Sequence, residues 1–410
     1  MALCCPSFFP VKTPPNIVPA PTTTGSHSLR KTGRALLEST GVPWMSLYMP
    51  VDPARNRIQL RNLLGQLRDD APHAGLTQAD IDPLLAPAED LLHEAMTTNE
   101  EINGVALFLT PGVEPPTLLP LPFAPSLVAQ IDKRPWMRPL WRGVEPDGHF
   151  YVLSLWEGGA KLHRASRHRI DVIPPGGAQN ALNAVLRADI HIESELNWPT
   201  PAADADEDAR RTPVIYKNQD DIRRKDFVED GLLRFFRRLD DRARPLLGDE
   251  SGPTPLVLAG PTELRRLYHE ANTYHHLMEE GIEDQIRIQG TAALHRRAWE
   301  IVQPRFDQPR TEALDHFHAA PERTAANPGS VLLAAMDGRI DTLFVAEEPV
   351  AWGTFDEDAH SVELHPQRKE GDIEFLNAAT ARTLQTGGTV YVTDAGDIPD
   401  GGPVAALLRY

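Results

Sequence analysis

The sequence lacks several features that would point directly to a function. Its only two cysteines, Cys4 and Cys5, are adjacent in a proline-rich N-terminal segment, so they offer neither a disulfide framework nor a thiolate metal site. Such cysteine usage is typical of a reducing compartment, and we expect a cytoplasmic protein. No apolar run approaches the roughly 18 residues of a membrane span, so we expect no membrane partner. The N-terminus also lacks the basic and apolar regions of a signal peptide.

Positive charge is scarce as well. Lys and Arg number 41 against 58 Asp and Glu, which gives a formal net charge of −17 at pH 7. A chain with this balance does not coat nucleic acid by bulk electrostatics, and we expect no DNA partner. Contact with RNA would therefore depend on local basic faces.

Common catalytic and nucleotide-binding motifs are absent from the sequence. It contains no G-x-x-x-x-G-K, G-x-G-x-x-G, G-x-S-x-G or H-E-x-x-H. His269, His275 and His276 are spaced i, i+6 and i+7, which does not place three ligands on one helical face. We therefore expect neither a metal ion nor a cofactor.

The sequence does contain alternating strand-like and helix-like segments. Residues 254–282 predict a short buried strand, a Gly260-Pro261 turn and an amphipathic helix, which is typical of a mostly parallel, two-sided sheet. The apolar run FYVLSLW at 150–156, a glycine-containing turn and a more polar strand over 160–173 predict a hairpin. The length of 410 residues fits two to three domains. These patterns predict an α/β fold.

We predict three domains after a disordered N-terminal extension. The extension covers residues 1–33, which are rich in proline, threonine and serine. An N-terminal α/β domain over 34–144 is followed by a middle domain over 145–285, which carries a mobile Pro/Asp-rich insertion at 197–225. A C-terminal α/β domain covers 286–410.

Apolar residues at helical spacing predict several helices in the second half of the chain. The strongest pattern covers residues 226–245, where Leu232, Phe236 and Leu239 share one face. Two separate helices are predicted over 294–302 and 311–325.

The segment KRPWMRPLWR at 133–142 is the first candidate for RNA contact. It interleaves two tryptophans with four cations, namely Lys133, Arg134, Arg138 and Arg142. Stacking on bases together with phosphate contacts suits this composition. The alternative is a proline-rich connector between domains whose tryptophans pack on both neighbours.

A stripe of arginines on the predicted helix over 226–245 is the second candidate. Arg234, Arg237 and Arg238 lie on one face next to the apolar one. Phosphate binding and a solvated face balanced by Asp240 and Asp241 are both consistent with this pattern.

The order and spacing of several segments resemble the bacterial archaeo-eukaryotic release factor family (baeRF), family 3. This family is related to the archaeal and eukaryotic class I release factor and to Pelota. The segments that carry the resemblance are WMSLYMP (44–50), IQLRNLL (58–64), HFYVLSL (149–155), LLRFFR (232–237), LVLAG (256–260), YHEANTYHHL (268–277), HRRAWE (295–300), GRIDTLFVA (338–346) and GGPVAALLRY (401–410).

The resemblance implies a fold and a partner. It implies that the middle domain is ribonuclease-H-like and that the C-terminal domain is like the kink-turn-binding ribosomal proteins. It also implies that the ribosome and its rRNA are the partner, and that the protein occupies the tRNA site in termination, rescue or hibernation.

The family's release factors carry a Gly-Gly-Gln loop after the middle-domain hairpin, and the resemblance makes Gly176, Gly177 and Gln179 the weak catalytic candidates here. The sequence reads Gly176-Gly177-Ala178-Gln179, so an added alanine displaces the glutamine by about 3.5 Å. Catalytic geometry tolerates much less. We therefore expect a release-factor-like, ribosome-associated translation protein without enzymatic activity. The alternatives are a peptidyl-tRNA hydrolase that uses Gln179 and a stress-related interaction protein that does not bind ribosomes.

Overall fold

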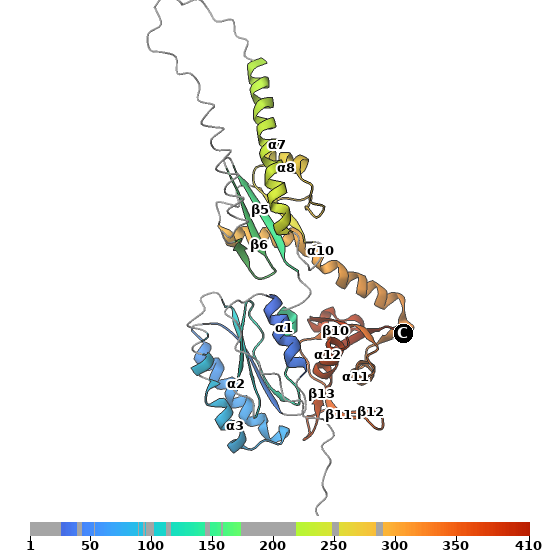
Figure 1. Cartoon of the computed structure of the whole chain (residues 1–410). Helices are drawn as coiled ribbons and strands as arrows, with labels where there is room; N and C mark the ends of the chain where they lie inside the picture. Colours follow the sequence, from blue (N-terminus) through green and yellow to red (C-terminus); the bar gives the residue numbers. More distant parts are fainter. Residues whose placement is uncertain are drawn as a thin grey trace, which may run out of the picture. The chain divides into compact units, whose positions relative to one another are not determined.

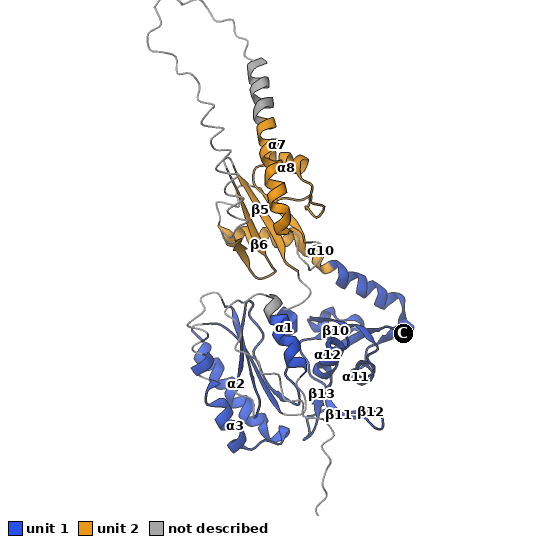
Figure 2. Cartoon of the chain, viewed as in Figure 1, with its two compact units in different colours: residues 1–146, 308–410 blue, residues 147–307 orange. Residues whose placement is uncertain are grey.

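A computed structural model of the protein describes residues 26–38, 43–52, 54–88, 90–92, 95, 102–111, 116–143, 148–156, 159–173, 219–247, 254–283 and 290–410 (Figure 1). The chain forms two compact units (Figure 2). Unit 1 contains residues 1–146 and 308–410, and unit 2 contains residues 147–307. The three predicted domains and their boundaries at 144 and 285 stay a prediction. Among the described residues, no helix is long and apolar enough to cross a membrane.

The first part of unit 1 is a four-stranded sheet with the order β3-β2-β1-β4. Its strands pair antiparallel and are β1 (Trp44–Pro50), β2 (Gly104–Leu109), β3 (Thr117–Leu121) and β4 (Val128–Asp132). Side chains on β1 alternate between two cores: Met45 and Leu47 pack in the core of α2 (Asn56–Asp70) and α3 (Gln78–Leu85), whereas Trp44 and Tyr48 enter the other. Because of this alternation, both faces of the short strand are buried.

The helix α1 (Ser26–Leu37) corrects the predicted end of the disordered extension. Leu29 and Leu36 of this helix are buried in the core that Trp44 also enters. A Cβ at Gly33 would lie 2.9 Å from the ring of Trp141, so the glycine allows helix and tryptophan to approach closely. Residues 26–33 are therefore folded, and the rest of the predicted extension lies outside the described residues.

The last part of unit 1 is a second four-stranded sheet with the order β14-β10-β15-β9. Its strands are β9 (Thr324–Ala325), β10 (Ile340–Ala346), β14 (Thr389–Thr393) and β15 (Val404–Leu408). β10 and β14 are parallel, whereas β15 is antiparallel to both β10 and β9. Side chains of α11 (Pro328–Met336) and α12 (Phe375–Gln385) share a core with this sheet. A small sheet, β12 (Ser361–Leu364), β11 (Trp352–Asp356) and β13 (Ile373–Glu374), was not predicted.

One hydrophobic core joins the two parts of unit 1. It contains Trp44, Tyr48 and Trp141 from the first part together with Leu332 and Phe375 from the last part. The helix α5 (Arg138–Gly143) belongs to the same core through Leu140 and Trp141. The first and last parts of the chain therefore fold as one unit because they bury a common set of side chains.

Unit 2 is a sheet with helices on both faces and the strand order β7-β6-β5-β8. Its elements are β5 (Phe150–Trp156), β6 (Gly159–Ala165), β7 (Ile170–Val172), α7 (Gln219–Leu247), β8 (Leu256–Ala259), α8 (Thr262–Ala271) and part of α10 (Thr291–Ala319). Tyr151 and Leu153 pack with α7 and α8, whereas Phe150 and Val152 pack with α10. Residues 219–225 of the predicted insertion are thus helical.

The sheet of unit 2 corrects the predicted, mostly parallel arrangement. Among the named strands of the described part of unit 2, β5 and β8 pair in parallel, and the pairs β5–β6 and β6–β7 are antiparallel. The hairpin between β5 and β6 imposes the antiparallel pairing, whereas β8 is reached by a crossover. The predicted corner after β8 is present: Gly260 has φ +146°, and a Cβ there would lie 2.3 Å from the carbonyl oxygen of Leu155.

The single helix α10 replaces two predicted helices. It runs from Thr291 to Ala319 through Pro304 and Pro309, which lack the N–H that a helix interior uses. Proline is a common helix end, which is why the sequence predicts a break. Four short 3-10 helices complete the described elements, at Ala71–Ala74 (η1), Pro321–Arg323 (η2), Ala395–Asp397 (η3) and Pro399–Gly401 (η4).

Candidate functional site

The basic segment at 133–142 lies within the common core of unit 1. Trp136 and Trp141 are both buried, and the ring of Trp136 lies 6.4 Å from that of Trp352. The backbone N–H of Trp136 donates to the Ser46 hydroxyl at 2.9 Å, and Tyr48 donates to the carbonyl oxygen of Trp136 at 2.5 Å. Both tryptophans are therefore part of the core of unit 1, and neither presents a face for stacking on a base.

Arg138 corrects one RNA-binding candidate, because its side chain has an exposed fraction of 0%. Its guanidinium lies 3.4 Å from the carboxylate of Glu374, which is equally buried. It also donates to the carbonyl oxygens of Ala346 and Pro349, at 2.8 and 2.9 Å. Burial lowers the pKa of Arg138, and the Glu374 carboxylate opposes this shift. Arg138 thus binds the last part of unit 1 and has no surface to offer to a phosphate.

Asn377 and Asp132 extend this buried polar cluster. The Asn377 side chain accepts from the backbone N–H of Met137 at 2.9 Å and donates to the carbonyl oxygen of Pro135 at 3.1 Å. Burial raises the pKa of Asp132 to about 6, and the neighbouring Glu374 carboxylate adds to that rise. The cluster satisfies backbone groups of the segment that could not otherwise be buried.

The other cations of the segment lie nearer to the surface. Arg142 is 41% exposed and donates to Glu347 at 2.6 Å and to Asp394 at 2.9 Å. Lys133 is exposed, and Arg134 is partly buried. The side chains of these three cations are therefore at least partly exposed. They are part of the folded unit 1, however, and not of a separate RNA-binding loop.

The arginine stripe on α7 is placed differently. Arg234, Arg237 and Arg238 are all exposed, whereas Phe236 and Leu239 of the same helix are buried in unit 2. The stripe is therefore a solvent-facing cationic surface on a helix whose other side is fixed by packing. Because these three side chains are exposed, burial does not prevent them from contacting a phosphate.

Asp240 fixes the orientation of α7. Its side chain is 1% exposed and accepts from Arg244 at 3.0 Å and from the backbone N–H of Thr273 at 3.2 Å. Tyr268 of α8 also donates to Asp240, at 3.4 Å, and burial raises the pKa of that phenol. Asp240 thus pairs with Arg244 of its own helix and holds the end of α8, while its balancing role for the three arginines of the stripe stays a prediction.

The weak catalytic candidates Gly176, Gly177 and Gln179 lie outside the described residues. Most of the predicted insertion at 197–225 does too. Of the histidines considered as metal ligands, His269 lies in α8, whereas His275 and His276 lie in a turn after that helix ends at Ala271.

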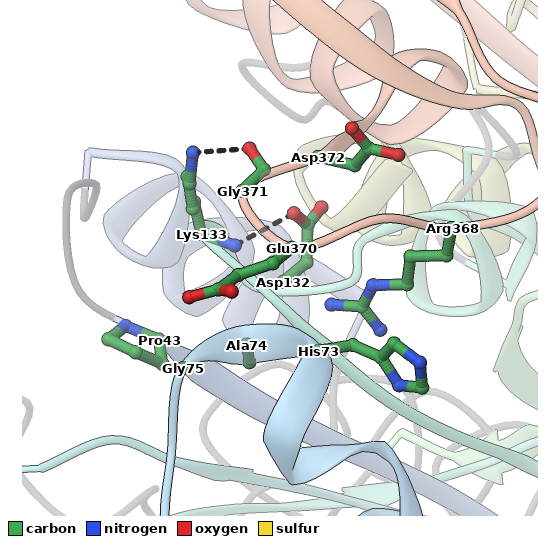
Figure 3. Close-up of a pocket in the computed structure, with 10 residues that line it drawn as sticks. All are labelled: Pro43, His73, Ala74, Gly75, Asp132, Lys133, Arg368, Glu370, Gly371 and Asp372. Carbon is green, nitrogen blue, oxygen red and sulfur yellow. Dashed lines mark hydrogen bonds between the residues drawn. The ribbon is translucent and has the colours of Figure 1, made fainter.

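Two cavities adjoin Lys133 in unit 1. The smaller, of about 150 Å³, is lined by η1 residues and by the charged side chains of Asp132, Arg368 and Asp372 (Figure 3). In the close-up, the Lys133 ammonium reaches the carbonyl oxygen of Gly371, and the bond measures 2.7 Å. The larger cavity, of about 1110 Å³, lies between α1, α11, α12 and β11.

Sequence reasoning missed the partners of the buried cluster. Glu347, Glu374 and Asn377 lie more than 200 positions after the segment that they bind. No local pattern marks them. The proline and tryptophan content of 133–142 was the one signal that could favour burial over exposure.

Comparison with known proteins gives a family match over part of the chain. Residues 149–339 match bacterial archaeo-eukaryotic release factor family 3. No curated protein matches the chain.

Solved structures of translation factors are also similar. Archaeal translation termination factor aRF1 is 16% identical, with 94% of this chain and 98% of that chain covered and a TM-score of 0.23. Archaeoglobus fulgidus Pelota is 14% identical, with 75% and 79% covered and a TM-score of 0.30. A ribosome-bound archaeal Pelota is 12% identical, with 75% and 77% covered and a TM-score of 0.34. These likenesses are too weak to carry a functional argument. The family match confirms, over residues 149–339, the resemblance of the sequence to bacterial archaeo-eukaryotic release factor family 3.

Proposed function

We propose that the protein is a release-factor-like translation protein that binds the ribosome and acts in stalling, rescue or hibernation without hydrolysing peptidyl-tRNA. The family match over residues 149–339 carries this proposal. The matched region includes the whole of α7, so the exposed arginine stripe lies within the part of the chain that is family-like.

The arginine stripe is the surface that we propose for rRNA contact. Three exposed guanidinium groups can each neutralise a phosphate, and guanidinium binds phosphate with two parallel hydrogen bonds. The chain as a whole is strongly acidic, so it would be repelled by rRNA wherever it lacks such a face. A local cationic helix therefore also favours one orientation on the ribosome.

The absence of hydrolysis rests on the sequence of the loop. Ala178 separates Gly177 from Gln179, and a shift of one residue moves the glutamine by about 3.5 Å. A second candidate function, peptidyl-tRNA hydrolysis through Gln179, is favoured by the same loop because it keeps both glycines and the glutamine.

Sedimentation of ribosomes with the purified protein tests the proposed partner. We expect co-sedimentation that falls as salt rises, and weaker co-sedimentation for the charge-reversed pair Arg234→Glu/Arg238→Glu. The pair Arg57→Glu/Arg61→Glu is a matched control, because both arginines are exposed at the same i, i+4 spacing on α2 of unit 1. Absence from the ribosomal fraction at low salt, or equal losses for both pairs, would contradict the proposal.

A release assay on stalled ribosomes separates the two candidate functions. We expect no release of the peptide by the wild-type protein. Release by the wild type that disappears in Gln179→Ala would show that the variant loop is catalytic.

A further inference from the structure

The larger cavity of unit 1 has a composition that neither the family match nor the proposed function uses. Its volume of about 1110 Å³ is slightly larger than the roughly 300–1,000 Å³ of most small-molecule sites. Residues from the two distant parts of unit 1 line it: Arg34 and Leu37 come from α1, whereas Met336 and Arg382 come from α11 and α12. The cavity therefore exists only when the first and last parts of the chain are packed together.

Four cations line this cavity in a protein that is acidic overall. They are Arg34, Lys133, Arg134 and Arg382. Burial lowers the pKa of Arg134, Asp132 opposes this shift, and the positive charge of Arg382 lowers the pKa further, so the two guanidinium groups lie within reach of each other's field. Two like charges near each other also attract an anion to the space that they share, although Asp132 already offsets part of the charge of Arg134.

Donor groups at the cavity remain available to such an anion. The Arg382 side chain is partly exposed, and its Nη2 makes one long bond of 3.4 Å to the carbonyl oxygen of Met336. Lys133 has three ammonium hydrogens, and the bond to Gly371 uses one of them (Figure 3). Arg34 is exposed at the rim.

The rest of the wall is suited to an organic group rather than to a bare anion. Leu37, Met336, Phe355 and Leu384 provide apolar surface, and Phe355 adds an aromatic face. Glu38 and Glu357 also line the cavity and can accept hydrogen bonds from hydroxyl groups. Asp337 also lines the cavity, and its carboxylate oxygen lies 3.6 Å from the Nε2 of His360.

From this arrangement we propose that the cavity binds a nucleotide-sized phosphorylated small molecule. Its phosphates contact Arg34, Lys133, Arg134 and Arg382, and its ring packs on the apolar wall. The chain has no glycine-rich phosphate loop, so guanidinium groups replace the backbone N–H groups that such loops supply.

Isothermal titration of the full chain with ATP, GTP, pyrophosphate and adenosine tests this proposal. We expect saturable binding of ATP or GTP, weaker binding of pyrophosphate, and no binding of adenosine. Arg382→Gln and Arg34→Gln should each weaken nucleotide binding roughly tenfold, the effect of losing one charge-assisted hydrogen bond. Arg57→Gln, an exposed α2 arginine outside the cavity lining, should bind as the wild type does.

Arg34→Gln keeps the test decisive if Arg382→Gln fails to fold, because Arg34 is exposed. A single-stranded RNA oligomer is titrated in parallel, since its phosphates could meet the same cations. Binding of RNA without binding of either mononucleotide, equal binding by the cavity variants and the wild type, or no nucleotide binding at low salt would each overturn the proposal.

Discussion

The segment at 133–142 and the arginine stripe on α7 are both basic and both alternate cations with apolar residues, yet their charges have different surroundings. Arg138 is completely buried beside Glu374, whereas Arg234 is exposed on a helix in unit 2. The difference comes from what each segment meets in space. The first is enclosed by residues from the other end of the chain, and the second has packing partners on one side only. A cationic pattern therefore indicates RNA contact only where the fold leaves one face uncovered.

The largest expected effect lies in the buried pair. Arg138→Met should lower the free energy of unfolding by about 3–5 kcal/mol, because it leaves the Glu374 carboxylate buried without its cation. Arg234→Met should change it by less than about 0.5 kcal/mol, because that side chain is exposed. Urea denaturation followed by tryptophan fluorescence measures both.

The double variant Arg138→Met/Glu374→Gln is the control for that comparison. It should recover part of the lost stability, because the remaining partner no longer carries a buried charge. Equal stability of Arg138→Met and the wild type would mean that the two segments do not differ as described.

The pH dependence of stability sharpens the contrast at Asp132. The pKa of this group is about 6 in the folded protein against 3.8 as its usual value, so the folded state holds the proton more tightly. Stability from this group is fully present below about pH 4 and is lost as pH rises through about 6. The loss is on the order of 3 kcal/mol.

Asp132→Asn should remove this loss. The variant should match the wild type near pH 4 and exceed its melting temperature at pH 7 and above. Thermal melts across this range check the sign, and a melting temperature at pH 7 that is lower in the variant would falsify the assignment of Asp132 as a strained carboxylate.

Arg142 gives a smaller effect because it is only partly buried. Arg142→Gln should lower the free energy of unfolding by about 1–2 kcal/mol, since Glu347 is buried and loses a charged donor at 2.6 Å. Asp394→Asn should change it by less than about 0.5 kcal/mol, because Asp394 is exposed. Chemical denaturation measures the free energy of unfolding of both variants. Equal losses would mean that the Arg142–Glu347 pair contributes no more than an exposed ion pair does.

The smallest expected effect on stability is at α7. Changing Arg234, Arg237 and Arg238 to Gln should alter the free energy of unfolding by less than about 0.5 kcal/mol for each residue. Ribosome binding should weaken, and the slope of log affinity against log salt should fall by about 1 for each phosphate that is no longer neutralised. Sedimentation at several salt concentrations measures the slope. A large loss of stability with an unchanged slope would assign the stripe to packing.

Much of the fold follows from patterns that are local. The strand β5 was predictable because both of its faces are apolar. The corner at Gly260 was predictable because a glycine followed by a proline indicates a turn. Two helices were predicted where the structure has the single helix α10, because Pro304 and Pro309 indicate a break. Tertiary packing of α10 outweighs this local preference, so the helix continues through both prolines. Pairing direction in unit 2 was also missed, since a short apolar strand does not reveal which neighbour it pairs with.

The candidate sites were predictable only in part, because burial depends on contacts between distant residues. Exposure of the α7 stripe follows from helical spacing, since Phe236 and Leu239 define the opposite face. Burial of Arg138 depends on Glu374 and on carbonyl groups near residue 347, which no pattern around residue 138 reveals. Burial of the two tryptophans in this segment agrees with the connector alternative only in part, because they pack on the last part of unit 1 and not on the domain that follows them in the sequence.

The common core of unit 1 also affects when the parts of the chain can fold during synthesis. Met137 and Asn377, which share a hydrogen bond, are 240 positions apart in the sequence. At synthesis rates of about 5–20 residues per second, roughly 10–50 s pass between the emergence of the two residues. During that interval Trp136 and Leu140 lack the side chains that later cover them, while unit 2, which is contiguous in the chain, can already fold. The nascent chain thus leaves apolar side chains of the first part of unit 1 without their later partners, and this is the stage at which chaperone binding or aggregation would compete with folding.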